Sequence, residues 1–195
     1  VFGDWSSDVC SSDLLLEAKG SPSGRPDILK PGKIYPCFQD SKMDAVNTVQ
    51  VFDWLWTSGQ LSEADIQQLP GLGIDLVVNL ALPTSPNALE NEGSLVTGLG
   101  MAYVHIPVIW EQPRVEQYDQ FSGVMGVFKG RRIWVHCAKN MRVSAFVTLY
   151  RRLVLDEDEE EASYPMRSIW HPDDTWQQFM DDVYRNMLPD GYHAK

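Results

Sequence analysis

Apolar residues recur along this chain in two patterns, one typical of buried strands and one typical of helices. Apolar or β-branched runs of strand length lie at 49–57, 76–82, 102–108 and 133–137. Apolar positions at helical spacing, or in a longer apolar stretch, predict helices after residue 62 and at 114–128, 143–155 and 173–186. Strands that alternate with helices predict an α/β domain with a central, mostly parallel sheet flanked by helices.

Several of these elements carry signals at their ends. Ser58-Gly59 is a turn signal after the first strand-like run. The segment Ser62-Glu-Ala-Asp65 has the form of a capping box with Asp in place of the usual Glu, and Pro70-Gly71 should end the helix that it starts. The run 76–82 is nearly all apolar, so we expect a strand that is buried on both faces.

One domain accounts for most of the chain. A length of 195 residues with 44% hydrophobic and 22% charged residues fits a single globular domain. We expect this domain to span residues 34–188, after a loose or non-native lead-in at 1–33 and before a tail at 189–195. The segment Phe2–Leu14 resembles the peptide obtained when sequencing-adaptor DNA is translated, so we leave it out of the functional interpretation.

Charge and cysteine content argue against several functional classes. The net charge of -11 argues against nucleic acid or an anionic membrane as the main partner, because both favour patches of Lys and Arg. No apolar run approaches the roughly 20 residues of a membrane helix. Cys10, Cys37 and Cys137 are odd in number and far apart, so we expect reduced thiols and a cytoplasmic protein. The acidic run at 156–161 is interpreted as a solvated face.

The residues from His136 to Ser144 (HCAKNMRVS) carry the candidate chemistry. A buried strand should end at Cys137, followed by a short loop and an apolar helix. The first N–H groups of a helix have no partner within it and form an anion site, which also favours the thiolate form of a nearby cysteine. Arg142 adds a planar, charged fork that matches phosphate oxygens. We therefore expect phosphate to bind the loop formed by Ala138, Lys139, Asn140, Met141, Arg142 and Val143.

This loop resembles that of the cysteine-dependent tyrosine phosphatases, especially the compact bacterial dual-specificity-like group, whose signature is His-Cys, five residues, Arg, then Ser or Thr. The resemblance extends over roughly 49–155 and includes the segments TSGQLSEADIQQL, GIDLVVNL and YVHIPV. It implies a tyrosine-phosphatase-like fold and a phosphocysteine intermediate on Cys137. It also implies phosphate binding by Arg142, and a Ser144 hydroxyl that helps the thiolate leave.

The spacing of this loop departs from the family signature. Four residues, not five, separate Cys137 from Arg142, whereas Ser144 lies where the family has its Ser or Thr. Either the loop is one residue tighter, or it keeps its length and Val143 takes the place of the arginine. On a helix one step turns a side chain by about 100°. Asn140 lies where the family often has Gly, and Asn tolerates a left-handed backbone.

The remaining site residues are assigned by position. Glu111 follows the HIPVIW segment where the family has its acid loop, and a carboxyl there would protonate the leaving oxygen. Asp119 is the alternative acid, although we expect it on the solvent face of its helix. We place Trp110 near a bound aromatic phosphate, and we interpret His136 as a structural residue that orients the loop. The other histidines give no metal-ligand spacing with His136 or the cysteines, so neither a metal nor a cofactor is expected.

Three functions fit these residues. The first is a metal-independent phosphomonoester hydrolase that acts on phosphotyrosine-like or other small phosphoesters, on a protein or a small molecule. The second is a phosphate-binding module with weak or no catalysis, suggested by the displaced arginine. The third is a rhodanese-like sulfurtransferase, which also places a cysteine between strand and helix, although the loop here lacks the run of Gly and Arg usual in that family.

Overall fold

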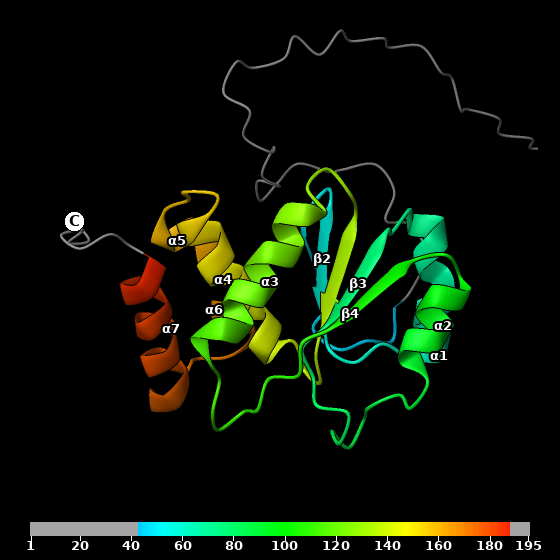
Figure 1. The fold of residues 1–195 in the computed structure, drawn as a ribbon, viewed down its shortest axis with the longest axis horizontal. Helices are drawn as coiled ribbons and strands as arrows, with labels where there is room; N and C mark the ends of the chain where they lie inside the picture. The colour runs from blue at the N-terminus through cyan, green and yellow to red at the C-terminus, as the bar shows by residue number, and fades with distance from the viewer. Residues whose placement is uncertain (1–42, 188–195) are drawn as a thin grey trace, which may run out of the picture.

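A computed structural model describes residues 43–187 of the chain. The predicted boundaries at residues 33 and 189 lie outside these residues, as do Phe2–Leu14, Cys10 and Cys37. Within the described part, strands and helices form one three-layer arrangement (Figure 1).

The centre of the structure is a five-stranded sheet with the order β1-β2-β5-β3-β4. Its strands are β1 (Val49–Phe52), β2 (Leu55–Ser58), β3 (Leu76–Asn79), β4 (Ala102–His105) and β5 (Ile133–His136). All neighbouring pairs are parallel except β1 and β2. The predicted α/β fold with a mostly parallel sheet is therefore confirmed.

The first strand-like run proved to be a hairpin and not a single strand. Phe52 pairs with Leu55, so the chain reverses through the two residues Asp53 and Trp54. The prediction of one strand at 49–57 was wrong because both halves are apolar and β-prone, and the turn between them contains no Gly or Pro to mark it.

Helices cover both faces of the sheet (Figure 1). On one face lie α1 (Glu63–Gln68), which continues into the 3-10 turn Leu69–Leu72, and α2 (Glu92–Gly98). The other face carries α3 (Val115–Val127), α4 (Met141–Leu153), α5 (Glu159–Ala162), α6 (Met166–Ile169) and α7 (Asp174–Met187). The predicted capping box starts α1, since Asp65 N donates to Ser62 Oγ at 3.1 Å and Ser62 N donates to Asp65 Oδ2 at 2.9 Å.

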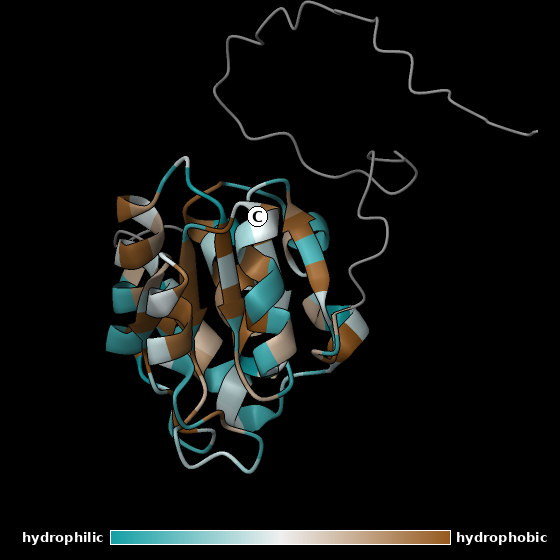
Figure 2. Cartoon of the chain, turned by 90° about the vertical axis from the view of Figure 1, so that its right-hand side faces the viewer, coloured by the Kyte–Doolittle hydropathy of each residue, from teal (hydrophilic) through white to brown (hydrophobic). Residues whose placement is uncertain are grey.

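Two hydrophobic cores lie on opposite faces of the sheet. On β5, Ile133 and Val135 belong to the core beneath α3, α4 and α7, whereas Trp134 belongs to the core beneath α1 and α2. Side chains of a strand alternate between faces, which accounts for this division. Figure 2 shows largely hydrophobic strands in the interior and helices that carry both hydrophilic and hydrophobic residues along their length. By the same alternation His136 belongs to the α2 face and Cys137 to the α4 face.

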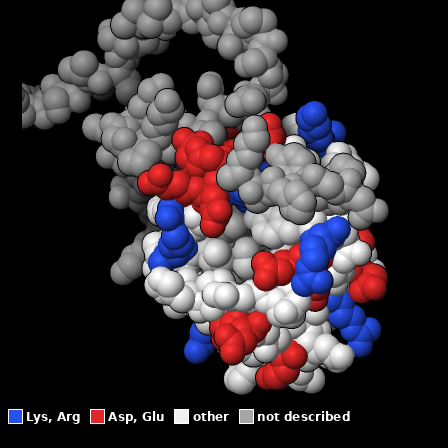
Figure 3. Space-filling view, turned by 90° about the vertical axis from the view of Figure 1, so that its left-hand side faces the viewer, with Lys and Arg blue, Asp and Glu red and all other residues white. Residues whose placement is uncertain are grey.

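The acidic run at 156–161 is only partly a solvated face. Acidic side chains gather on the face that carries α5 and α7 (Figure 3), and Glu159, Glu160 and Glu161 of α5 are exposed there. Glu157, however, is buried against Arg151, with its Oε2 2.6 Å from Arg151 Nη2. Burial raises the pKa of Glu157, and the hydrogen bond from Arg151 opposes that effect. The prediction was thus wrong for Glu157, whose ion pair with Arg151 links the segment after α4 to that helix.

None of the helices in residues 43–187 has the length and apolar character needed to cross a membrane.

Candidate active site

Cys137 lies at the carboxyl end of the central strand β5, between the parallel strands β2 and β3. Its side chain is fully buried, and its N–H donates to Ser58 O at 3.3 Å. Ligands of open α/β sheets bind beyond the carboxyl ends of the strands. The cysteine therefore occupies the position at which the fold builds a site.

The carbonyl groups that follow Cys137 are engaged by neighbouring segments. Ala138 O accepts hydrogen bonds from Gln60 N at 3.3 Å and from Asn87 Nδ2 at 3.0 Å. Lys139 O accepts one from Asn47 Nδ2 at 2.9 Å. Neighbouring segments thus bind the carbonyl oxygens of Ala138 and Lys139, so these negative ends of the peptide groups are engaged away from an anion in the loop.

The N–H groups of Met141, Arg142 and Val143 open α4, and none of them has an acceptor among the residues that the structure describes. The first backbone donors of a helix cannot pair within it. Consecutive free N–H groups around a helix N-terminus form a concave anion site. We call residues 137–144 the phosphate loop from here on.

Asn140 sets the conformation of the phosphate loop. Its φ of 64° lies in the left-handed region, and it occupies the N-cap position of α4. Its Nδ2 donates to Asn47 O at 2.7 Å and to Thr57 Oγ1 at 3.0 Å. A left-handed residue at the third position after Cys137 favours the interpretation in which the loop keeps the family's length. Val143 then stands at the arginine position, and its side chain is fully buried in the core.

Arg142 lies one position earlier and points toward an aromatic cluster. Its Cζ lies 5.5 Å from the centroid of the Trp110 ring, a cation–π distance. The residue is only 9% exposed, and its Nε has no hydrogen-bond partner among the described residues. Trp110 is itself fixed, because Trp176 Nε1 donates to Trp110 O at 3.1 Å and the rings of Trp170 and Trp176 pack against it.

The Ser144 hydroxyl is engaged on both sides. It donates to Met141 O at 2.9 Å and accepts from Trp170 Nε1 at 3.0 Å. Within the described residues it makes no hydrogen bond to Cys137. The structure therefore places Ser144 at the end of the phosphate loop but gives its hydroxyl other partners than the Cys137 thiol.

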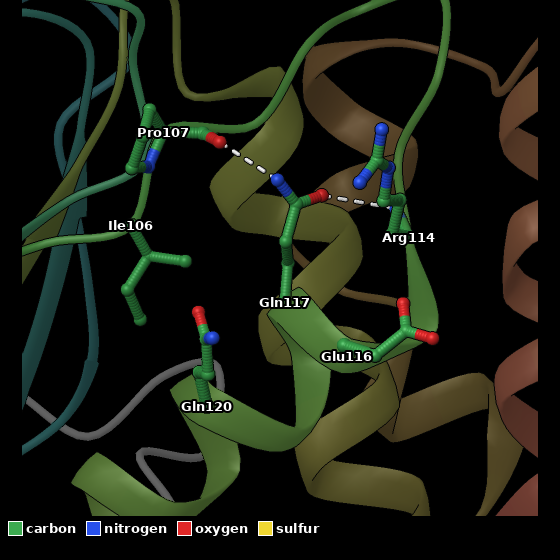
Figure 4. A pocket seen from close by; sticks show the side chains of 6 residues that line it. All are labelled: Ile106, Pro107, Arg114, Glu116, Gln117 and Gln120. Carbon is green, nitrogen blue, oxygen red and sulfur yellow. Dashed lines mark hydrogen bonds between the residues drawn. The ribbon is translucent and has the colours of Figure 1, made fainter.

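Glu111 lies on the loop between β4 and α3, directly after Trp110, and its side chain is exposed. Gln117 ties the two ends of this loop together (Figure 4), since its Nε2 donates to Pro107 O at 2.7 Å and its Oε1 accepts from Arg114 N at 3.0 Å. The packing of Trp110 on Arg142 brings this loop against the first turn of α4. The alternative acid, Asp119, is exposed on α3.

His136 is buried on the opposite face of the sheet and meets Glu92, a residue that the sequence interpretation missed. Its Nε2 lies 3.1 Å from Glu92 Oε1. Glu92 also accepts hydrogen bonds from Gln60 Nε2 at 2.7 Å, Asn79 Nδ2 at 2.6 Å and Tyr103 OH at 2.8 Å. Burial alone would raise the pKa of Glu92, but the contacts with His136, Tyr103 and Gln60 outweigh it and hold the pKa below its ordinary value.

The residues between 43 and 187 contain no group of three or more His, Cys, Asp and Glu side chains that could hold a metal ion.

The sequence of residues 33–181 matches the family described as dual-specificity-type tyrosine phosphatase fused to NAD+ kinase. The chain belongs to this phosphatase family. The match covers most of the domain, and it confirms the resemblance that the phosphate loop first indicated. It also favours a phosphatase over a rhodanese-like sulfurtransferase as the parent of this fold.

Solved structures of phosphatases have the same fold. A DUF442 protein from Shewanella putrefaciens CN-32, described as a candidate phosphatase, is 32% identical over 74% of this chain and 95% of its own, with a TM-score of 0.66. PTPMT1, solved in complex with PI(5)P, is 12% identical over 72% of this chain and 96% of its own, with a TM-score of 0.63. TpbA from P. aeruginosa is 14% identical over 73% of this chain and 91% of its own, with a TM-score of 0.57.

At identities of 12% and 14%, the likeness to PTPMT1 and TpbA shows the shared fold alone. No curated protein sequence matches the chain.

Proposed function

We propose that this phosphatase-family domain hydrolyses phosphate monoesters with Cys137 as its nucleophile and without a metal ion. The observation that carries the proposal is the set of free N–H groups at residues 141–143, which closely follow a cysteine at the carboxyl end of the central strand. Backbone donors arranged around an anion stabilise the charge of a transferring phosphoryl group without reorganisation. The nucleophile and the charge-stabilising group thus lie in one loop.

The proposed reaction has two steps. The Cys137 thiolate attacks phosphorus, a P–S bond forms, and the P–O bond to the leaving group breaks while an acid donates a proton to the leaving oxygen. Water then attacks the phosphocysteine, which releases inorganic phosphate and returns the thiolate. Arg142 would hold the phosphoryl oxygens from the side of Trp110, and Glu111 is the proposed acid because its loop lies against the first turn of α4.

The proposed substrates are phosphotyrosine-like or other small phosphoesters. Trp110 supports this class, since its ring lies beside the phosphate loop and would flank an aromatic leaving group. We place the activity in the cytoplasm, because a thiolate nucleophile depends on a compartment that keeps cysteine reduced.

A second candidate function is phosphate binding without efficient turnover. Val143 favours it, because an apolar side chain buried in the core stands where the family has its phosphate-binding arginine. The two candidates share the anion site and differ in whether Arg142 replaces the missing charge during the reaction.

Turnover of p-nitrophenyl phosphate in the presence of a metal chelator separates these candidates. The proposal predicts hydrolysis by the wild-type chain and none by Cys137→Ser. Hydrolysis that survives the substitution would rule out the cysteine mechanism. If the wild type is inactive but phosphate or vanadate protects Cys137 from alkylation, the binding function is the correct one.

A further inference from the structure

Glu92 is a buried carboxylate that lies outside the site described above. It is the first residue of α2, on the face of the sheet opposite to α4, and it is only 3% exposed. An isolated charge in such a place is strongly unfavourable, so a buried carboxylate needs donors around it. Here the carboxylate oxygens are surrounded by His136, Gln60, Asn79 and Tyr103.

Two of these neighbours of Glu92, His136 and Gln60, lead directly to the phosphate loop. His136 is the residue before Cys137, and its imidazole Nε2 lies 3.1 Å from Glu92 Oε1. Gln60 donates its side-chain N–H to the same oxygen at 2.7 Å, and its backbone N–H donates to Ala138 O at 3.3 Å. One carboxylate oxygen therefore contacts both His136, the residue before Cys137, and Gln60, whose backbone N–H binds Ala138 O.

Asn79, on the neighbouring strand β3, is a further donor to Glu92 and lies next to His136 in the sheet. Asn79 Nδ2 donates to Glu92 Oε2 at 2.6 Å, and Asn79 pairs with His136 in the register of β3 and β5. Leu80 N then donates to His136 O at 2.9 Å. The imidazole of His136 thus contacts Glu92, and its carbonyl is bound by Leu80, the residue after Asn79.

We propose that Glu92 is a positioning residue that holds the phosphate loop in its anion-binding conformation through His136 and Gln60. The inference rests on the proposed function of that loop. Glu92 lies behind the sheet and touches neither substrate nor reacting atoms. Its effect is transmitted through groups that set the direction of the backbone at Cys137 and Ala138. When supporting contacts of this kind are removed, the site loses its geometry and the rate falls by roughly tenfold to a hundredfold.

The test measures anion binding separately from turnover. Alkylation of Cys137 in the full chain is followed by peptide mass spectrometry over a range of vanadate concentrations, for the wild type, Glu92→Gln and Glu157→Gln. The last is a matched control, because Glu157 is another buried, ion-paired carboxylate and contacts Arg151 at the far end of α4. We expect Glu92→Gln to raise the half-protecting concentration at least about tenfold, and Glu157→Gln to stay within about twofold.

A double-mutant cycle with His136→Asn shows whether Glu92 acts through His136. If it does, the half-protecting vanadate concentration of the double variant should be about that of the more affected single variant, because both changes interrupt the same set of contacts. Tyr103→Phe is a milder variant that removes one donor from Glu92, and we expect a smaller loss of protection. It keeps the test decisive if Glu92→Gln fails to fold.

The outcomes are distinguishable. If vanadate protects Cys137 equally well in the wild type and in Glu92→Gln, the positioning role is overturned and the proposed function stays intact. If Glu92→Gln does not fold, the same comparison is made with Tyr103→Phe. Wild-type Cys137 that neither vanadate nor phosphate protects would overturn both. If vanadate protects the wild type, Glu92→Gln weakens that protection, and the wild type does not hydrolyse p-nitrophenyl phosphate, the positioning role is supported. The function is then phosphate binding and not hydrolysis.

Discussion

The guanidinium of Arg142 lies over the indole ring of Trp110, with 5.5 Å between Cζ and the ring centroid. This contact joins the first turn of α4 to the loop that carries Glu111. The side chain of the next residue, Val143, is buried in the core, whereas Arg142 lies against Trp110, which packs on Trp170 and Trp176.

Trp110→Leu should therefore weaken phosphate binding, although Trp110 lies outside the phosphate loop. The substitution removes the cation–π contact, a loss of roughly 1 to 2 kcal/mol at a desolvated site, so kcat/KM should fall about tenfold. Trp110→Phe keeps an aromatic ring and should lose much less. Steady-state kinetics of both variants with p-nitrophenyl phosphate measures the difference, and equal losses would show that the ring does not position Arg142.

Arg142→Ala and Val143→Ala should have opposite consequences. Arg142→Ala should abolish most protection of Cys137 by phosphate while the fold persists. Val143→Ala should lower the free energy of unfolding by about 2 kcal/mol, because it removes methyl groups from a filled core, and leave the half-protecting phosphate concentration nearly unchanged. Urea denaturation and alkylation of each variant provide the two measurements. The reverse pattern would show that Val143, and not Arg142, faces the anion.

Glu111→Gln should slow substrates according to their leaving group. An alkyl phosphate has a poor leaving group that needs a proton from the acid, whereas p-nitrophenolate departs without one. We expect kcat for an alkyl phosphate to fall about a hundredfold and kcat for p-nitrophenyl phosphate to fall only a few-fold. Asp119→Asn is the matched control. Equal effects of Glu111→Gln on both substrates would remove Glu111 from this role.

Acidification should selectively remove the stabilisation that Glu92 provides. The pKa of Glu92 is held below its ordinary value of 4.5, so near that pH the unfolded chain binds more protons at this residue than the folded chain. Its contribution is complete above the unfolded pKa and is lost as the pH falls through the folded one. Urea denaturation of the wild type and Glu92→Gln at several pH values below about 5.5 should show their stabilities converging. A difference that stays constant would contradict the shifted pKa.

The sequence predicted the parts of the fold that depend on local pattern. The buried strands and the helices α3, α4 and α7 follow from apolar runs and spacing that each segment carries itself. The turn at Asp53 and Trp54 has no such mark, and α5 and α6 span only Glu159–Ala162 and Met166–Ile169, too short for a helical period to be visible.

The candidate site was predictable where its residues are adjacent in sequence. Cys137, Asn140 and Arg142 could be placed in one loop, and the free N–H groups follow from the position of that loop before a helix. The network of Glu92 could not be predicted, because α2, β3, β4 and β5 supply its members and meet only in the folded chain. Asn79, a polar residue inside an apolar strand, was the one local sign of it.

Detection of a covalent phosphate on Cys137 would identify this residue as the nucleophile. The chain is mixed with radiolabelled phosphoester, quenched with denaturant during turnover and digested, and the label is located by peptide mapping. We expect label on Cys137 in the wild type and none in Cys137→Ser. Sustained hydrolysis with no label on Cys137, or hydrolysis that persists in Cys137→Ser, would contradict it.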